Sequence, residues 1–177
     1  LAGAGTQTSA LGFGGGFPGG ALTEKWNGTN WTAVNTLNTG RRYLAGAGAS
    51  NTAALAFGGE NAGTANVAVT EAYNGTNWTE VNDLNTARQK LAGCGTSTAA
   101  LAFGGDNPTL TESWNGTNWT ETGNLATARS SLAGAGTNTA GLAFGGNQGP
   151  GAATEEFNTG VPIANVWITA NSMNTAR

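Results

Sequence analysis

One motif occurs four times along the chain, and this repetition constrains the fold more than any other feature. Each copy begins with Leu-Ala-Gly, passes through Phe-Gly-Gly and Thr-Glu, reaches a Trp and ends near an Arg. The four copies span residues 1–43, 44–90, 91–131 and 132–177. We therefore expect a single domain, residues 1–177, assembled from four copies of one supersecondary unit.

Short alternating segments within each unit indicate β-strands. Residues 53–57 alternate small and large side chains, so Leu55 and Phe57 should face one packed side. Residues 44–48 form a second expected strand of mostly Gly and Ala, and we expect the intervening turn at residues 49–51. Because Gly weakens a strand interior, its repeated use here predicts close approach to another backbone.

An Asn-Gly hairpin should join the third and fourth strands of a unit. It occupies residues 26–31 and recurs at residues 73–78 and 114–119. Asn-Gly supplies the positive φ angles of a tight turn, and the flanking aromatic residues should face each other across the strands. Four short strands at a period of about 40 to 50 residues predict an all-β propeller with four four-stranded antiparallel blades.

The order of these residues resembles the kelch repeats, a family of β-propellers that includes the central domain of galactose oxidase. Four features carry the resemblance, which covers the whole chain. The Gly-Gly doublets are Gly14, Gly15, Gly58, Gly59, Gly104, Gly105, Gly145 and Gly146. The third-strand aromatics are Trp26, Tyr73, Trp114 and Phe157, and the fourth-strand residues are Trp31, Trp78, Trp119 and Trp167. Each unit then ends in Arg, and the resemblance implies four-stranded blades packed on their neighbours.

Charged residues also follow the repeat. One slot holds Glu24, Glu71, Glu112 and Glu155, and another holds Arg41, Arg88, Arg129 and Arg177. Because a guanidinium readily forks onto a carboxylate, we expect a structural ion pair within or between units. The functional alternative is a ring of acids or arginines around a pore.

The composition argues against catalysis. The chain has no His, which removes the usual general base and the imidazole ligands that the galactose oxidase copper site needs. We therefore expect a protein that is not an enzyme, with no catalytic residue, no cofactor and no metal. The acids Asp83, Asp106, Glu155 and Glu156 are expected to be ordinary surface acids, and Cys94 to be a small buried filler.

Two surface features are candidates for function. The first is the Asn-x-Thr sequence at Asn27, Asn30, Asn74, Asn77, Asn115 and Asn118. In a secreted protein these would be N-glycosylation acceptors, although turn chemistry is the favoured interpretation. The second is loop variation on a copied scaffold, which is where recognition tends to lie. The candidate recognition residues are Glu60, Asn61, Asn66, Asn158 and Asn165.

These observations favour a non-enzymatic structural or binding module outside the cell or on a virion surface, such as part of a fibre, adhesin or tail. Its expected ligand is a glycan or a protein. The alternative is an intracellular kelch-type adaptor, and a carbohydrate-active enzyme ranks third. The net charge of −3 with seven Lys and Arg residues predicts no nucleic-acid partner and no membrane insertion.

The chain ends bear on assembly. Residue 1 and residue 177 are in phase with the repeat, which predicts a segment processed or excised from a longer repeat protein. The first unit is as small and apolar as the internal ones and is not a polar cap, so its outer face must be covered. We expect a self-closed ring of four blades, and a ring shared with another copy or a stacked fibre is the alternative.

Overall fold

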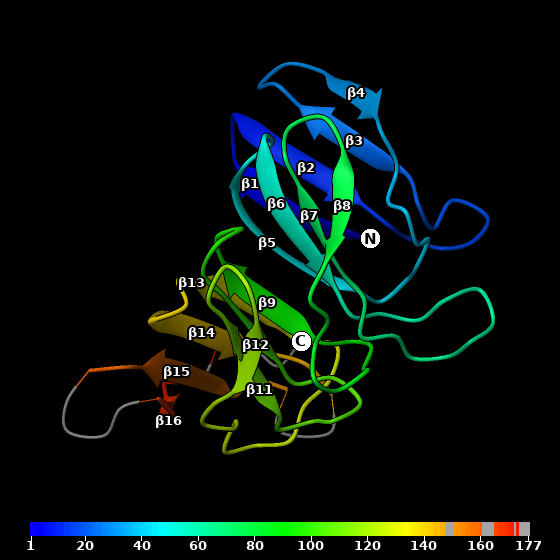
Figure 1. The fold of residues 1–177 in the computed structure, drawn as a ribbon. Coiled ribbons are helices and arrows are strands. Elements are labelled where there is room, and N and C mark those ends of the chain that lie inside the picture. The colour runs from blue at the N-terminus through cyan, green and yellow to red at the C-terminus, as the bar shows by residue number, and fades with distance from the viewer. Residues whose placement is uncertain (148–150, 161–164, 172, 174–177) are drawn as a thin grey trace.

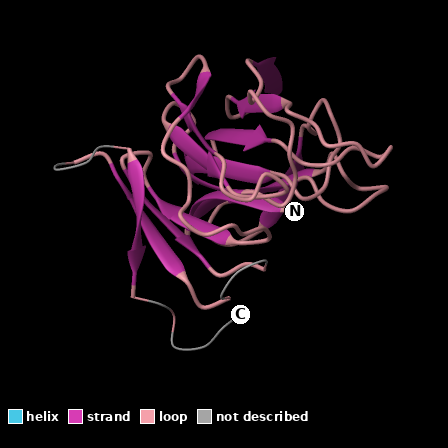
Figure 2. Ribbon diagram, turned by 90° about the horizontal axis from the view of Figure 1, so that it is seen from below, coloured by secondary structure: helices cyan, strands magenta, loops and turns pink. Residues whose placement is uncertain are grey.

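The structure is a computed structural model that describes residues 1–147, 151–160, 165–171 and 173. Arg177, one of the expected ion-pair residues, lies outside the described residues. The described chain is all-β, and its loops and strands are shown in Figure 2.

Each repeat forms one four-stranded antiparallel sheet whose strands follow one another in chain order (Figure 1). The first sheet contains β1 (Ala2–Thr6), β2 (Ser9–Phe13), β3 (Thr23–Trp26) and β4 (Trp31–Val34). The second contains β5 (Ala45–Ser50), β6 (Ala53–Phe57), β7 (Thr70–Tyr73) and β8 (Trp78–Val81). The third contains β9 (Ala92–Gly95), β10 (Ala100–Phe103), β11 (Thr111–Trp114) and β12 (Trp119–Glu121). The fourth contains β13 (Ala133–Gly136), β14 (Ala140–Phe144), β15 (Thr154–Asn158) and β16 (Val166–Ala170).

The Asn-Gly hairpins adopt the expected geometry. Trp26 pairs directly with Trp31 across β3 and β4, and the two ring centroids lie 5.5 Å apart. The turn glycine Gly28 has a φ of 95°, in the left-handed region that Gly adopts at little cost. The hairpin is therefore fixed both by its turn and by the aromatic pair that flanks it.

The expected turn at residues 49–51 is wrong by about two residues. Strand β5 continues through Ser50 after a register shift that follows Ala47, and the turn is formed at Asn51 and Thr52. The Asn51 side chain donates a hydrogen bond to the carbonyl oxygen of Trp26 at 2.6 Å, and its backbone amide donates to Ser9 Oγ. These bonds to the first sheet draw the turn toward Asn51 and leave Ser50 in the strand.

Neighbouring sheets pack through their first strands, with β1 against β5, β5 against β9 and β9 against β13. A Cβ atom on Gly46 would lie 2.5 Å from the Phe13 ring and 3.2 Å from the carbonyl oxygen of Gly3. Gly93 and Gly134 show the same restriction against Phe57 and Phe103. Glycine in these strands thus admits both a neighbouring backbone and a neighbouring aromatic ring.

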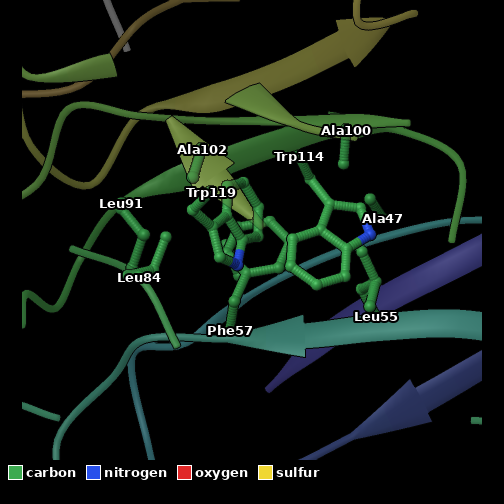
Figure 3. Packing of buried hydrophobic residues seen from close by; sticks show 10 residues of the cluster. Ala47, Leu55, Phe57, Leu84, Leu91, Ala100, Ala102, Trp114 and Trp119 are labelled. Carbon is green, nitrogen blue, oxygen red and sulfur yellow. The ribbon is translucent and has the colours of Figure 1, made fainter. Parts of the chain in front are cut away.

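The hydrophobic core lies between the sheets. Figure 3 shows the cluster between the second and third sheets, where Phe57 meets Trp119 with ring centroids 4.9 Å apart. The indole Nε1 of Trp119 donates to Thr70 Oγ1 at 3.1 Å, so its one polar atom is satisfied inside the core. Equivalent clusters lie at the other two interfaces.

The array is propeller-like, but the expected closure into a ring of four blades is not observed within the described residues. No packing as extensive as that between neighbouring sheets joins β1 to β13. The first and fourth sheets lie at opposite ends of the array in Figure 1. Leu1 is 81% exposed, whereas Leu44 and Leu91, which open the second and third repeats, are each 5% exposed.

Candidate functional site

Buried ion pairs link each repeat to the next. Arg41 Nη1 lies 2.6 Å from Glu71 Oε1, and both side chains are fully buried. The same relation joins Arg88 to Glu112 at 3.3 Å and Arg129 to Glu155 at 2.6 Å. The pairs therefore lie between units, one of the two arrangements that the sequence left open.

Further hydrogen bonds hold these buried charges in place, although Nε of Arg41 and Nε of Arg88 have no partner among the described residues. Arg41 also donates to the carbonyl oxygen of Ala56 at 3.0 Å, and Glu71 accepts from the backbone amides of Asn38 and Thr39. Fixed backbone partners on both sides hold the guanidinium and the carboxylate in one geometry. Such a network suits a structural clamp between sheets.

Burial governs the protonation of the guanidinium groups. Desolvation lowers the pKa of Arg88 to about 10, although the charge and hydrogen bond of Glu112 act to raise it. The pKa of Arg41 is also lowered by burial, against the opposing effect of Glu71. Since a pKa of about 10 lies well above neutral pH, Arg88 remains positively charged there.

Glu24 differs from the other three acids of its slot. It is exposed on the outer face of the first sheet, whereas Glu71, Glu112 and Glu155 are fully buried. Arg177, the fourth Arg of the set, lies outside the described residues. The three buried acids face a neighbouring repeat and do not line an open pore.

The Gly-Gly doublets support the Arg-bearing segments. In the second repeat, the Gly59 amide donates to the carbonyl oxygen of Arg88 at 2.9 Å. Gly58 has a φ of 64°, and a Cβ there would lie 2.8 Å from the same carbonyl oxygen. Gly15 and Gly105 donate in the same way to Arg41 and Arg129. The Gly-Gly doublets thus fix the backbone of each Arg, whose side chain then reaches the next sheet.

The inserted loop of the second repeat also makes contacts between repeats. Arg42 Nε donates to Glu60 Oε1 at 2.7 Å, and this hydrogen bond is the main cause of a lowered Glu60 pKa. Asn66 donates to Asp106 of the third repeat, and Asn61 accepts amide hydrogen bonds within its own loop. The structure therefore places these candidate recognition residues in supporting contacts.

The Asn-x-Thr residues lie on the exposed hairpins at one edge of the array. Asn27 Oδ1 accepts from the backbone amides of Thr29 and Asn30, both at 2.9 Å. Asn74 and Asn115 make the same bonds in their own hairpins. The first Asn of each hairpin thus closes the turn. The second Asn connects sheets in two cases, since Asn35 donates to Asn77 and Asn82 donates to Asn118, each at 2.7 Å.

The fourth repeat departs from this pattern and leaves a cleft. In place of the Asn-Gly sequence it has a longer connecting segment, of which Asn165 packs on Gly123, where the earlier repeats have Asn35 and Asn82. A Cβ on Gly123 would lie 1.7 Å from the carbonyl oxygen of Asn165, so no other residue fits there without movement. The substitution of Gly for Asn therefore admits Asn165.

The resulting cleft lies between the third and fourth sheets and has a volume of about 290 Å³. Its polar lining includes Thr120, Glu121, Asn138, Thr139, Thr159 and Asn165, and Phe157 adds an apolar patch. Hydroxyl and amide groups both donate and accept hydrogen bonds, whereas Phe157 is only 2% exposed and closes the floor of the cleft as part of the core. This combination suits a small polyhydroxylated ligand.

The sequence pattern indicates only part of this cleft. Asn165 was a candidate recognition residue, and Asn158 is close by because its carbonyl oxygen accepts from the Asn165 amide at 2.9 Å. The contributions of Asn138, Thr139 and Glu121 were missed. Two features of the sequence could have indicated the cleft: the fourth repeat lacks the Asn-Gly hairpin, and Gly123 replaces the Asn of the earlier repeats. Both changes fall at the interface between the third and fourth sheets.

Cys94 is buried between the third and fourth sheets. Desolvation raises the pKa of its thiol to about 12, so the group is neutral at physiological pH. Its Sγ donates a weak hydrogen bond to the carbonyl oxygen of Thr137 at 3.4 Å. A neutral buried thiol is a poor nucleophile and packs as a small apolar group.

The acids Asp83, Asp106, Glu155 and Glu156 do not converge, and the expectation that all four are surface acids is wrong for Glu155, which is fully buried. Asp83 accepts from the Thr70 amide, Asp106 binds Asn66, and Glu155 binds Arg129. Within the described ranges, no group of three or more His, Cys, Asp or Glu residues is placed to hold a metal ion. The same part of the chain contains no helix long and apolar enough to cross a membrane.

Comparison with known proteins gave no match to a family model and none to a curated protein.

Proposed function

We propose that this chain is a non-enzymatic, kelch-like β-propeller module that acts outside the cell or on a virion surface. Its role would be structural and adhesive, as in a fibre, adhesin or tail, and its ligand a glycan. The observation that carries this proposal is the polar cleft between the third and fourth sheets.

The lining of the cleft favours an uncharged polar ligand. Thr120, Asn138 and Thr139 supply hydroxyl and amide groups, and Glu121 is the one carboxylate among the lining residues. A single acid beside hydroxyls and amides is suited to accept hydrogen bonds from sugar hydroxyls. The low content of charged residues, 10% of the chain, also favours hydrogen bonding over ionic recognition.

A glycan array followed by titration calorimetry tests this function. We expect a hit whose affinity falls by about tenfold or more in Asn138→Ala, equivalent to about 1.4 kcal/mol of binding free energy. Ser97→Ala is the matched control because Ser97 holds the same turn position in the third repeat, outside the lining of the cleft. Absence of any glycan hit, or equal losses in the two variants, would contradict glycan recognition at the cleft.

A further inference from the structure

We infer that the open face of the first sheet binds the open face of the fourth sheet of a second copy of this chain. The contact would be head-to-tail and would use the residues that already join sheets within the chain. This inference concerns the ends of the array and does not depend on the ligand of the cleft.

The interface between the first and second sheets supplies the template. It contains three contacts between specific residues: Leu44 against Gly14, Phe13 over Gly46, and Trp78 Nε1 donating to Thr23 Oγ1 at 3.1 Å. The preceding sheet contributes Phe, Thr and the first Gly of the doublet, and the following sheet contributes Leu, Gly and Trp.

The same three contacts recur at the other two interfaces. Between the second and third sheets they are Leu91 against Gly58, Phe57 over Gly93, and Trp119 to Thr70. Between the third and fourth sheets they are Leu132 against Gly104, Phe103 over Gly134, and Trp167 to Thr111. A face that carries one half of the set is therefore complementary to a face that carries the other half.

The first sheet carries one half of the set without a partner. Leu1 and Trp31 are 81% and 51% exposed, whereas Trp78 and Trp119 are each 5% exposed. A Cβ on Gly3 would contact only the carbonyl oxygen of Leu11, which belongs to the same sheet. The space beside Gly3, which a Phe ring from the preceding sheet fills at the equivalent glycines, is therefore empty. These residues line a hollow of about 510 Å³.

The fourth sheet carries the other half. Phe144 is half-buried, whereas its equivalents Phe13, Phe57 and Phe103 are completely buried. Phe144 and Thr154 line a second hollow, of about 520 Å³, together with Leu142, Glu156 and Ala170. Docking of a second copy would place its Gly3 over Phe144, its Trp31 against Phe144 with Nε1 near Thr154 Oγ1, and its Leu1 beside Gly145.

Charge does not select the partner, because an acid lies on each face and Glu156 lines the hollow of the fourth sheet. Glu24 stands in the slot of the three buried acids and is exposed on the same face as Trp31. The residues of the two faces are spaced like those that already join neighbouring sheets within the chain. This match, and not apolar character alone, indicates that the partner is a second copy of the chain.

Symmetry defines the expected product. A head-to-tail interface closes if two copies meet twice around a twofold axis, and it otherwise propagates as a filament. Two chains joined at both ends would form a ring of eight sheets, with both outer faces covered. Either product buries Trp31 and Phe144 against each other.

Sedimentation velocity and native mass spectrometry of the whole chain test the inference. We expect a species of twice 17.6 kDa or a larger concentration-dependent assembly. Trp31→Asn should remove the docking ring, and Gly3→Val should fill the empty space beside residue 3, and either should weaken association by about tenfold or more. Tyr43→Asn is the matched control, because Tyr43 is 47% exposed, away from the two hollows, and its φ of 54° suits Asn.

Two results would overturn the inference. One is a parent chain that stays monomeric up to about 100 μM. This concentration is well above the Kd expected of a protein interface of standard size. The other is a dimer that neither Trp31→Asn nor Gly3→Val weakens by about tenfold, or that Tyr43→Asn weakens equally. Circular dichroism of each variant confirms that the sheets are retained, so that loss of association is not loss of fold.

Discussion

Arg41 of the first repeat binds Glu71 of the second, with a guanidinium nitrogen 2.6 Å from a carboxylate oxygen. Both side chains are fully buried, so the pair crosses the interface between two sheets in a place that water does not reach. Since two further pairs repeat this relation, each repeat depends on its neighbour to satisfy a buried charge.

Replacement of Arg88 by Ala should destabilise the fold by about 3 kcal/mol or more, because Glu112 would remain buried without its partner. The free energy of unfolding in urea measures the loss. Arg42→Ala is the control, because the Arg42 side chain is 37% exposed and its solvent-screened pair with Glu60 should contribute much less than a buried pair. Equal stability of Arg88→Ala and the parent would refute a structural role for the pair.

The Glu60–Arg42 pair should make stability dependent on acid pH. The hydrogen bond from Arg42 lowers the pKa of Glu60 below its ordinary value of 4.5. A carboxyl group with a lowered folded-state pKa stabilises the protein above about pH 4.5, and this contribution is lost as the pH falls through the folded-state pKa. In Glu60→Gln, the fall in melting temperature between pH 6 and pH 3 should be smaller than in the parent. Identical pH profiles would contradict the prediction.

Cys94 should resist alkylation in the folded protein. Burial raises the pKa of its thiol to about 12, so at pH 8 almost no thiolate is present and the sulfur is also inaccessible. We expect iodoacetamide to modify Cys94 at least about a hundredfold faster in denaturant than in buffer, as measured by intact mass. Rapid modification of the native chain would show that the third and fourth sheets open readily.

Tyr73 should tolerate loss of its hydroxyl group. Its ring is buried against Trp78, but its hydroxyl has no hydrogen-bond partner among the described residues, whereas Trp114 at the same position donates to the carbonyl oxygen of Ser97. Tyr73→Phe should therefore leave the stability unchanged or raise it by up to about 1 kcal/mol, since an unpaired buried polar group is removed. Tyr73→Ala, which removes the ring, should cost about 3 kcal/mol or more. A large loss in Tyr73→Phe would reveal a bound partner for the hydroxyl.

The repetition in the sequence predicted most of the fold. Alternation at residues 53–57 matched strand β6, and the Asn-Gly hairpins followed from turn chemistry, because both depend on residues adjacent in the chain. The turn after residue 48 was misplaced, since Asn51 bonds to Trp26 and Ser9, which are distant in sequence.

The candidate site was less accessible to sequence reasoning. The cleft depends on how Asn165 of the fourth repeat packs on Gly123, a contact between two repeats that periodicity cannot predict. The choice of Glu71 rather than Glu24 as the partner of Arg41 also depends on packing between sheets. Local pattern thus defined the repeated unit, whereas contacts across interfaces defined the pairing and the cleft.

Double-mutant cycles that share Glu71 test most directly the claim that each repeat is clamped to the next. The cycle of Arg41→Met with Glu71→Gln should give a coupling of about 1.5 kcal/mol or more, because these residues form the buried pair. The cycle of Arg88→Met with Glu71→Gln, within one repeat, should give less than about 0.5 kcal/mol. A larger coupling of Glu71 to Arg88 than to Arg41 would contradict the clamp between repeats.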